Sequence, residues 1–275
     1  LSLAALPGCG KKEKVSTACR DDNFAQPADP NSRTLSTAPS LLRHAVMDPM
    51  SPFAEVVRGV QVRVLQQRQN GRDMKVVATV STLRGEGATT LAANLAQTLA
   101  ASGHLTLLVD ADMRSLDLSR RLSTGGAPGL FEVMAGEAAL NDTLWRDPQT
   151  GMRFLPAGRH GPIPHAAALL ASRRARDLID SLRGTYDYVV MDLPPLAAAT
   201  DAHAAADLVE GFVLAVEWGR TRDDVLVEAL HRFDAGDTHL LGAVLNKTNL
   251  RELPRWTGTP QALAPWTAPA APRVA

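Results

Sequence analysis

Short apolar runs alternate with segments of helical periodicity through the middle of the chain. From residue 51 to 69, apolar residues recur at three- and four-residue steps, which predicts an amphipathic helix. Farther on, largely apolar runs of four to six residues predict buried strands, and one three-residue segment predicts a short strand. The expected strands are Val76–Val80, Leu105–Val109, Arg153–Leu155, Tyr188–Met191, Phe212–Val216 and Leu240–Leu245. The further expected helices are Thr90–Ala101, Ser172–Leu182, Asp201–Ala206 and Asp223–Phe233.

Continuous apolar strands with helices between them are typical of an α/β fold, in which helices cover both faces of a parallel β-sheet. We place this domain at residues 47–250. Residues 1–46 are rich in Ser, Pro, Asp, Asn and Lys and have no sustained apolar period, so we expect them to be disordered. Residues 251–275 are rich in Pro and Ala, and we expect a flexible tail.

Composition narrows the classes of partner. The chain carries 29 basic and 29 acidic residues, and this balance provides no long-range field to attract nucleic acid. We therefore expect no nucleic-acid partner. No apolar run reaches the ~18 residues that a membrane-spanning helix needs.

A glycine-rich segment joins the first strand to the second helix. Glycines there let backbone amides approach an anion, and the start of a helix adds partial positive charge. A regular phosphate loop reads G-x-x-x-x-G-K-[ST]. Gly87 and Thr89 fit this pattern, whereas Ala88 occupies the lysine position and Thr82 the first glycine position.

Two other interpretations of this segment remain open. The glycines could form a turn that only joins strand to helix. Alternatively, Gly85-Glu86-Gly87 with Asp110 at the end of the next strand resembles a dinucleotide fingerprint, although its third glycine would fall on Thr90.

Three aspartates follow the ends of predicted strands. Asp110 and Asp112 end the run Leu107-Leu108-Val109, and Asp192 follows Val189-Val190-Met191 in a Walker B pattern. Carboxylate oxygens are ligands that Mg²⁺ prefers. Because ligands bind at the carboxyl ends of parallel strands, we expect the three to meet beside the glycine loop. The competing interpretation is a set of solvated strand-end acids.

Taken together, these segments resemble the cytoplasmic domain of the bacterial tyrosine kinases of capsule and exopolysaccharide synthesis. That family belongs to the same deviant P-loop group as the septum-site and partition ATPases. The resemblance covers roughly residues 48–248. It is carried by Asp48 to Glu55, Gly85-Glu86-Gly87, Ala93 to Ala96, Val109 to Arg114, Gly129-Leu130, Val133 to Glu137, Leu155 to Gly158, Tyr186 to Pro195, Thr200-Asp201-Ala202 and Val244-Leu245-Asn246.

The resemblance implies ATP and Mg²⁺ as cofactors. Asp110, Asp112 and Asp192 would be the catalytic carboxylates, and Thr89 would hold Mg²⁺ together with Asp110 and Asp192. Asn246 would touch adenine. The phosphates would lie against Arg84, Gly85, Glu86, Gly87, Ala88, Thr89 and Thr90.

Four positions depart from the family pattern. Ala88 replaces the lysine that neutralises phosphate charge, and Leu193 replaces a polar residue after the Walker B acid. Gln61 replaces the last arginine of the oligomer-forming Glu-x-x-Arg-x-x-Arg motif. Active members phosphorylate tyrosines in their own tails, but the chain's two tyrosines are Tyr186 and Tyr188.

We weigh three functions. The first is a regulatory, kinase-like protein of exopolysaccharide or capsule synthesis with impaired or absent phosphotransfer. It would be cytoplasmic, and peripheral at the inner membrane through a membrane-embedded chain-length regulator or export component. It could also form homo-oligomers. The second is an active tyrosine kinase on other proteins, with Arg84 or a partner's cation in place of the lysine. The third is a partition-type ATPase, although Leu83 occupies the place of those enzymes' extra lysine.

Overall fold

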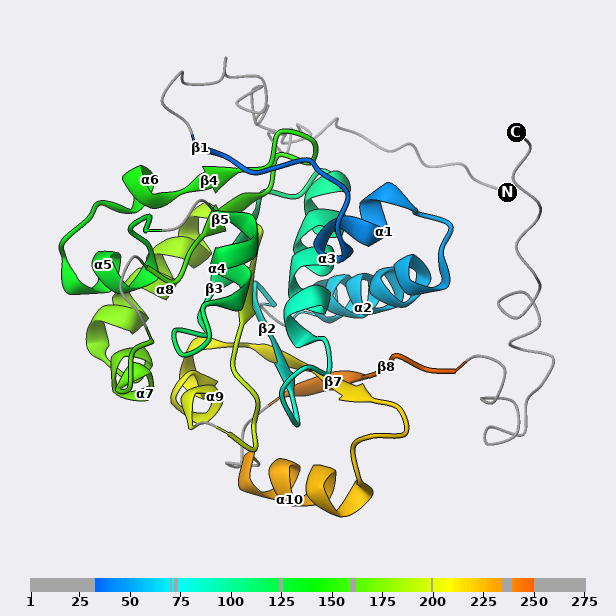
Figure 1. Cartoon of the computed structure of the whole chain (residues 1–275). Coiled ribbons are helices and arrows are strands. Elements are labelled where there is room, and N and C mark those ends of the chain that lie inside the picture. Colours follow the sequence, from blue (N-terminus) through cyan, green and yellow to red (C-terminus); the bar gives the residue numbers. More distant parts are fainter. Residues whose placement is uncertain are drawn as a thin grey trace, which may run out of the picture. The chain divides into compact units, whose positions relative to one another are not determined.

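The computed structural model describes residues 33–249, apart from residues 70, 72–73, 124–125, 159–161, 199 and 234–238. In these residues, eight strands form one sheet in the order β1-β4-β5-β3-β6-β2-β7-β8 (Figure 1). Its pairs are parallel except β4 with β5, so the predicted parallel sheet is confirmed. The strands are β1 (Arg33–Thr34), β2 (Val76–Ser81), β3 (Thr106–Asp110), β4 (Trp145–Arg146), β5 (Arg153–Leu155), β6 (Tyr188–Asp192), β7 (Gly211–Glu217) and β8 (Leu240–Asn246).

Helices cover both faces of the sheet (Figure 1). They are α1 (His44–Met47), α2 (Pro52–Gln69), α3 (Ala88–Ala101), α4 (Asp117–Leu122), α5 (Leu130–Ala135), α6 (Leu140–Thr143), α7 (Ala166–Leu170), α8 (Arg173–Thr185), α9 (Asp201–Ala204) and α10 (Asp223–Phe233), with 3-10 turns η2 (Leu41–Arg43) and η3 (Ala206–Leu208).

Successive residues of the central strands belong to two different cores. In β2, Val76 and Ala78 pack with residues of α5, α7, α8, α9 and α10. Val77 lies between them in sequence and packs with residues of α1, α2 and α3. Side chains that alternate along a strand point to opposite faces, so a strand buried on both sides must be apolar throughout. This requirement explains the continuous apolar runs.

Many predicted elements lie at or near their predicted bounds. The structure places β5 at Arg153–Leu155 and α10 at Asp223–Phe233, as the sequence predicts. The helix expected over residues 51–69 is α2. Helices α4 to α7 are absent from the prediction, because elements of four to six residues carry too little periodicity.

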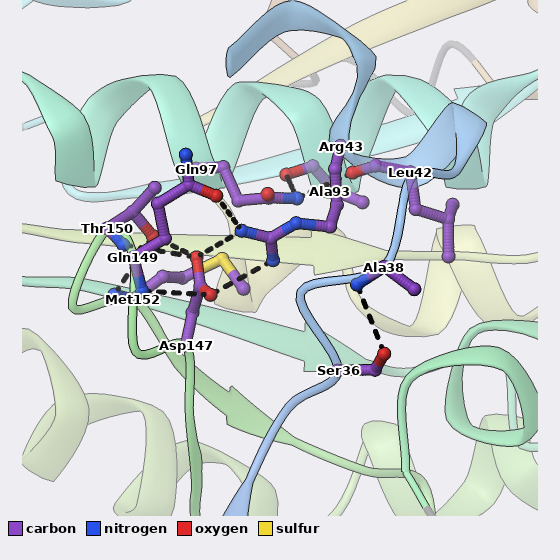
Figure 2. A network of polar contacts seen from close by, with 10 residues as sticks. All are labelled: Ser36, Ala38, Leu42, Arg43, Ala93, Gln97, Asp147, Gln149, Thr150 and Met152. Atoms are coloured by element: carbon purple, nitrogen blue, oxygen red, sulfur yellow. Dashed lines mark hydrogen bonds and ion pairs between the residues drawn. The ribbon is translucent and has the colours of Figure 1, made fainter. Parts of the chain in front are cut away.

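The predicted disorder of residues 1–46 is wrong for residues 33–46. These residues form β1, η2 and most of α1. β1 pairs with β4, and η2 and α1 lie against α3. In Figure 2, Arg43 reaches Asp147 in a buried ion pair of 2.9 Å and donates to Gln149 at 2.7 Å. Asn94 of α3 accepts the Ala45 amide at 2.8 Å. These partners are distant in sequence, so local composition could not reveal them.

The remainder of the predicted disordered segment, residues 1–32, and the predicted tail, residues 251–275, lie outside the described residues. In the part of the chain that the structure describes, none of the helices combines the length and apolar character needed to cross a bilayer.

Candidate functional site

The glycine loop connects the carboxyl end of β2 to the amino end of α3. Gly85 and Gly87 have φ angles of 85° and 102°, a left-handed conformation that side chains other than glycine rarely adopt. Gly87 is the N-cap of the 14-residue helix α3. The amides of the first helical turn have no partners within the helix, so they point at this loop as potential donors to an anion.

The Glu86 side chain turns inward and braces the loop. It is fully buried and accepts the amide of Leu83 at 2.7 Å. Its other oxygen accepts the amide of Glu217, at the end of β7, at 3.3 Å and the hydroxyl of Thr221. The loop is therefore fixed to the β7–α10 connection rather than free to follow a ligand.

Asn246, the last residue of β8, and Lys247 after it also support the loop. Asn246 donates to the carbonyl of Glu86 at 2.7 Å and lies so close to Gly87 that a β-carbon at Gly87 would overlap its amide nitrogen. Lys247 donates to the carbonyl of Gly85 at 2.7 Å. Asn246, predicted to touch adenine, therefore also shapes the phosphate loop.

Two of the three predicted acids are register partners on neighbouring strands. Asp110 of β3 pairs with Asp192 of β6. Asp110 is fully buried and accepts the amide and hydroxyl of Ser119 at 2.8 and 2.5 Å. Burial raises the pKa of Asp110 to about 7, although these hydrogen bonds act in the opposite direction.

Asp192 faces the start of α3. Its pKa is raised well above the ordinary value by burial and then by the charge of Asp110, while a hydrogen bond with Thr89 opposes the shift. In the described structure its Oδ1 is buried without a hydrogen-bond partner. A buried carboxylate oxygen of this kind, beside the hydroxyl of Thr89, suits a hard cation.

No group of three or more His, Cys, Asp or Glu side chains in the described residues is arranged to hold a metal ion. Mg²⁺ is commonly bound by one or two carboxylates with substrate phosphates rather than by a cage of protein ligands. Thr89 and Asp192, with Asp110 behind them, fit this kind of shared site.

Asp112 caps the turn that follows β3. Its carboxylate accepts hydrogen bonds from the amide of Ser115 at 3.0 Å and from the hydroxyl of Ser115 at 2.6 Å. It also accepts the amide of Arg114 at 3.2 Å. Arg114 in turn binds the fully buried carboxylate of Asp201 through two hydrogen bonds of 2.6 and 3.0 Å. The hydrogen bond with Asp201 raises the pKa of Arg114. This bidentate pair ties α9 to the connection between β3 and α4.

A cleft of about 450 Å³ opens between the glycine loop and α4, within the usual size range of small-ligand sites. It is lined by Ser81, Arg84, Gly85, Gly87, Ala88, Thr89, Thr90, Asp112, Arg114, Ser115, Asp117, Arg120, Arg121, Pro162, Leu193 and Pro195.

The structure brings the predicted site residues together in two layers. Seven of them line the cleft: Arg84, Gly85, Gly87, Ala88, Thr89, Thr90 and Asp112. Asp110 and Asp192 lie behind this lining, and Glu86 and Asn246 brace the loop. The predicted site set lacks the arginines of the opposite wall. Arg114 could have been found from its Asp-x-Arg spacing, whereas nothing in the sequence distinguishes Arg120.

In α2, the residues of the predicted oligomer-forming motif lie in different environments. Arg58 pairs with Glu55 on the exposed side of α2. Gln61, where the family pattern has a second arginine, is buried and donates to Ser102 of the segment after α3 at 2.8 Å. This side chain holds α2 against α3 and is not presented outward.

Comparison with known proteins gives consistent matches. The family described as AAA domain matches residues 74–209. The chain is 36% identical over 259 residues to succinoglycan biosynthesis transport protein ExoP of Rhizobium meliloti, covering 93% of this chain and 33% of ExoP. It is 32% identical to tyrosine-protein kinase CpsD of Streptococcus agalactiae, covering 66% of this chain and 78% of CpsD. The crystal structure of the VpsO kinase domain matches with 30% identity and a TM-score of 0.62, covering 72% of this chain and all of that domain.

Proposed function

Because the chain belongs to the bacterial tyrosine-protein kinase family, we propose that it is a nucleotide-binding member that regulates exopolysaccharide or capsule synthesis with impaired phosphotransfer. The observation that carries this proposal is the contrast between Ala88 and its surroundings. The loop, the helix start and the acids are in place, while the side chain at the lysine position is a methyl group lining the cleft.

The missing charge affects the transition state more than the resting complex. Phosphoryl transfer is catalysed by positioning and by neutralising charge on the transferred group. Mg²⁺, held by Thr89 and Asp192, would neutralise part of that charge when bound. Backbone amides of Gly87 and the first turn of α3 would still bind phosphate oxygens. Nucleotide binding can therefore persist where transfer is slow.

Similarity to ExoP supports a role at a membrane. The chain spans 33% of the length of ExoP, whose name describes it as a transport protein of succinoglycan biosynthesis. We propose that this chain acts on the cytoplasmic side of the inner membrane with a membrane-embedded chain-length regulator or export component. Co-purification with a co-expressed chain-length regulator tests this association.

The decisive experiment compares the protein with its Ala88→Lys variant. Ala88 lines the cleft, so a lysine there can extend into it. With γ-labelled ATP, Mg²⁺ and a tyrosine peptide, we expect the variant to incorporate label about 100-fold faster, which is the usual effect of one transition-state cation. Equal, robust and metal-dependent transfer by the unmodified protein would instead establish an active kinase on other proteins.

A further inference from the structure

The cleft wall carries an excess of positive charge. Four arginines line it, namely Arg84, Arg114, Arg120 and Arg121, against the two acids Asp112 and Asp117. Two of these guanidiniums are already paired. Arg114 holds the buried Asp201, and Arg121 lies 3.5 Å from Asp117.

The other two arginines are free to bind a ligand. Arg84 and Arg120 are exposed, and neither makes an ion pair or a side-chain hydrogen bond within the described residues. Arg84 belongs to the glycine loop and Arg120 to α4, so the two approach the cleft from different walls. Unpaired guanidiniums that line one cleft repel each other and favour an anion between them.

Helix α4 is held firmly enough to present Arg120 at a defined position. Its neighbour Ser119 is bound through both amide and hydroxyl to Asp110 at the end of β3. The Ser119 hydroxyl also accepts the amide of Ala157 at 2.8 Å. The backbone beside Arg120 is therefore anchored to the same strand ends that carry the acids.

We propose that Arg84 and Arg120 together hold the β- and γ-phosphates of a nucleoside triphosphate, in place of the lysine that Ala88 replaces. This inference rests on the nucleotide site of the proposed function. Guanidinium groups bind phosphate through paired hydrogen bonds, which a point charge on lysine does not provide. Two arginines on separate walls would clamp the phosphates across the cleft, rather than contact them from the loop alone.

Calorimetric titration of the whole protein with MgATP, inorganic tripolyphosphate and AMP tests this assignment. We expect Arg84→Gln and Arg120→Gln each to weaken binding of MgATP and tripolyphosphate by about tenfold, the usual effect of losing a charged hydrogen-bond partner. AMP binding should not change. Arg120→Lys should recover part of the loss. The matched control is Arg173→Gln on α8, whose side chain is 92% exposed and lies outside the cleft.

The same variants in an Ala88→Lys background provide a second, independent readout. If the arginines replace the lysine, adding it should reduce the effect of Arg120→Gln severalfold. The inference is overturned if both arginine variants bind MgATP like the unmodified protein, or if MgATP binds only after Ala88→Lys. The first result leaves the proposed function untouched, since that proposal fails on label transfer to tyrosine, whereas the second would also remove its nucleotide-binding part. Circular dichroism of each variant confirms that it is folded.

Discussion

The carboxylate of Glu86 in the glycine loop accepts a hydrogen bond from the hydroxyl of Thr221, 135 residues later in the chain. The contact ties the phosphate loop to the segment that enters α10. Because Glu86 also accepts the amides of Leu83 and Glu217, its removal would leave three half-buried donors without this partner.

We therefore predict that Glu86→Ala lowers the free energy of unfolding by about 1–3 kcal/mol, because it leaves half-buried donors unpaired. Binding of MgATP should weaken as well, since the loop is no longer held. Urea unfolding and calorimetry measure the two effects. Glu55→Ala, at a side chain that is 51% exposed, is the control and should change neither. An unchanged free energy of unfolding for Glu86→Ala would show that the hydrogen bonds of Glu86 do not stabilise the fold.

Gly87 provides a second test of the loop, because two separate constraints meet there. Its φ angle is 102°, and a β-carbon would overlap the side chain of Asn246. Gly103 has a φ angle of 87°, but a β-carbon there would meet nothing within 4 Å. The two glycines thus share the backbone conformation and differ in the contact.

We predict that Gly103→Ala costs about 1–2 kcal/mol of stability through backbone strain alone and leaves MgATP binding unchanged. Gly87→Ala should cost at least as much and also remove MgATP binding, since the loop or Asn246 must move. Adding Asn246→Ala should restore part of the stability. If Gly87→Ala binds MgATP with unchanged affinity, the close contact does not define the loop.

The buried pair of Arg43 and Asp147 joins the residues before α1 to the turn between β4 and β5. We predict that Arg43→Met lowers the unfolding free energy by about 3–5 kcal/mol, because it leaves the Asp147 charge buried and uncompensated. Adding Asp147→Asn should recover much of the loss. Arg173→Met, from an exposed pair with Asp177, should change stability by less than about 1 kcal/mol. Equal losses for the two arginine variants would contradict this account.

The sequence predicts the architecture and the meeting of the acids for one physical reason. Strands buried on both faces must be continuously apolar, and their carboxyl ends share one edge of a parallel sheet. Asp110 and Asp192 follow two such runs, so their pairing in register follows from where the runs end. Local sequence patterns are sufficient to predict a feature when, as with these apolar runs, the residues that determine it are neighbours in the sequence.

Partners that lie far apart in sequence explain what the sequence does not predict. The order of residues 33–46 depends on Arg43 meeting Asp147, and the burial of Glu86 depends on Glu217 and Thr221. The second wall of the cleft depends on α4, a helix of six residues without a clear period. From composition alone, charged residues such as Arg43, Asp147 and Glu86 are expected at the surface. The folded chain shows that they are buried.

The raised pKa values of the two strand-end acids predict how stability depends on pH. Asp110 has a folded pKa of about 7, against the ordinary value of 3.8. Between these values the unfolded carboxyl is ionised while the folded one keeps its proton. The unfolded state therefore binds fewer protons, and stability falls as pH rises through this window, by up to about 1.4 kcal/mol per pH unit for each such group.

Asp192→Asn should remove one of the two contributions to this fall in stability with rising pH. The pKa of Asp192 is raised, so its carboxyl opposes folding above the ordinary value, whereas an amide is neutral throughout. Its amide oxygen can still accept from Thr89, and the other carboxylate oxygen has no partner to lose. We predict a variant that is more stable than the unmodified protein at pH 8, and whose free energy of unfolding falls less steeply between pH 5 and 7.

Urea unfolding of the nucleotide-free protein at each pH measures both quantities. The exposed Asp224→Asn is the control and should keep the original slope. If Asp192→Asn also keeps it, Asp192 is ionised in the folded protein and burial does not govern its charge.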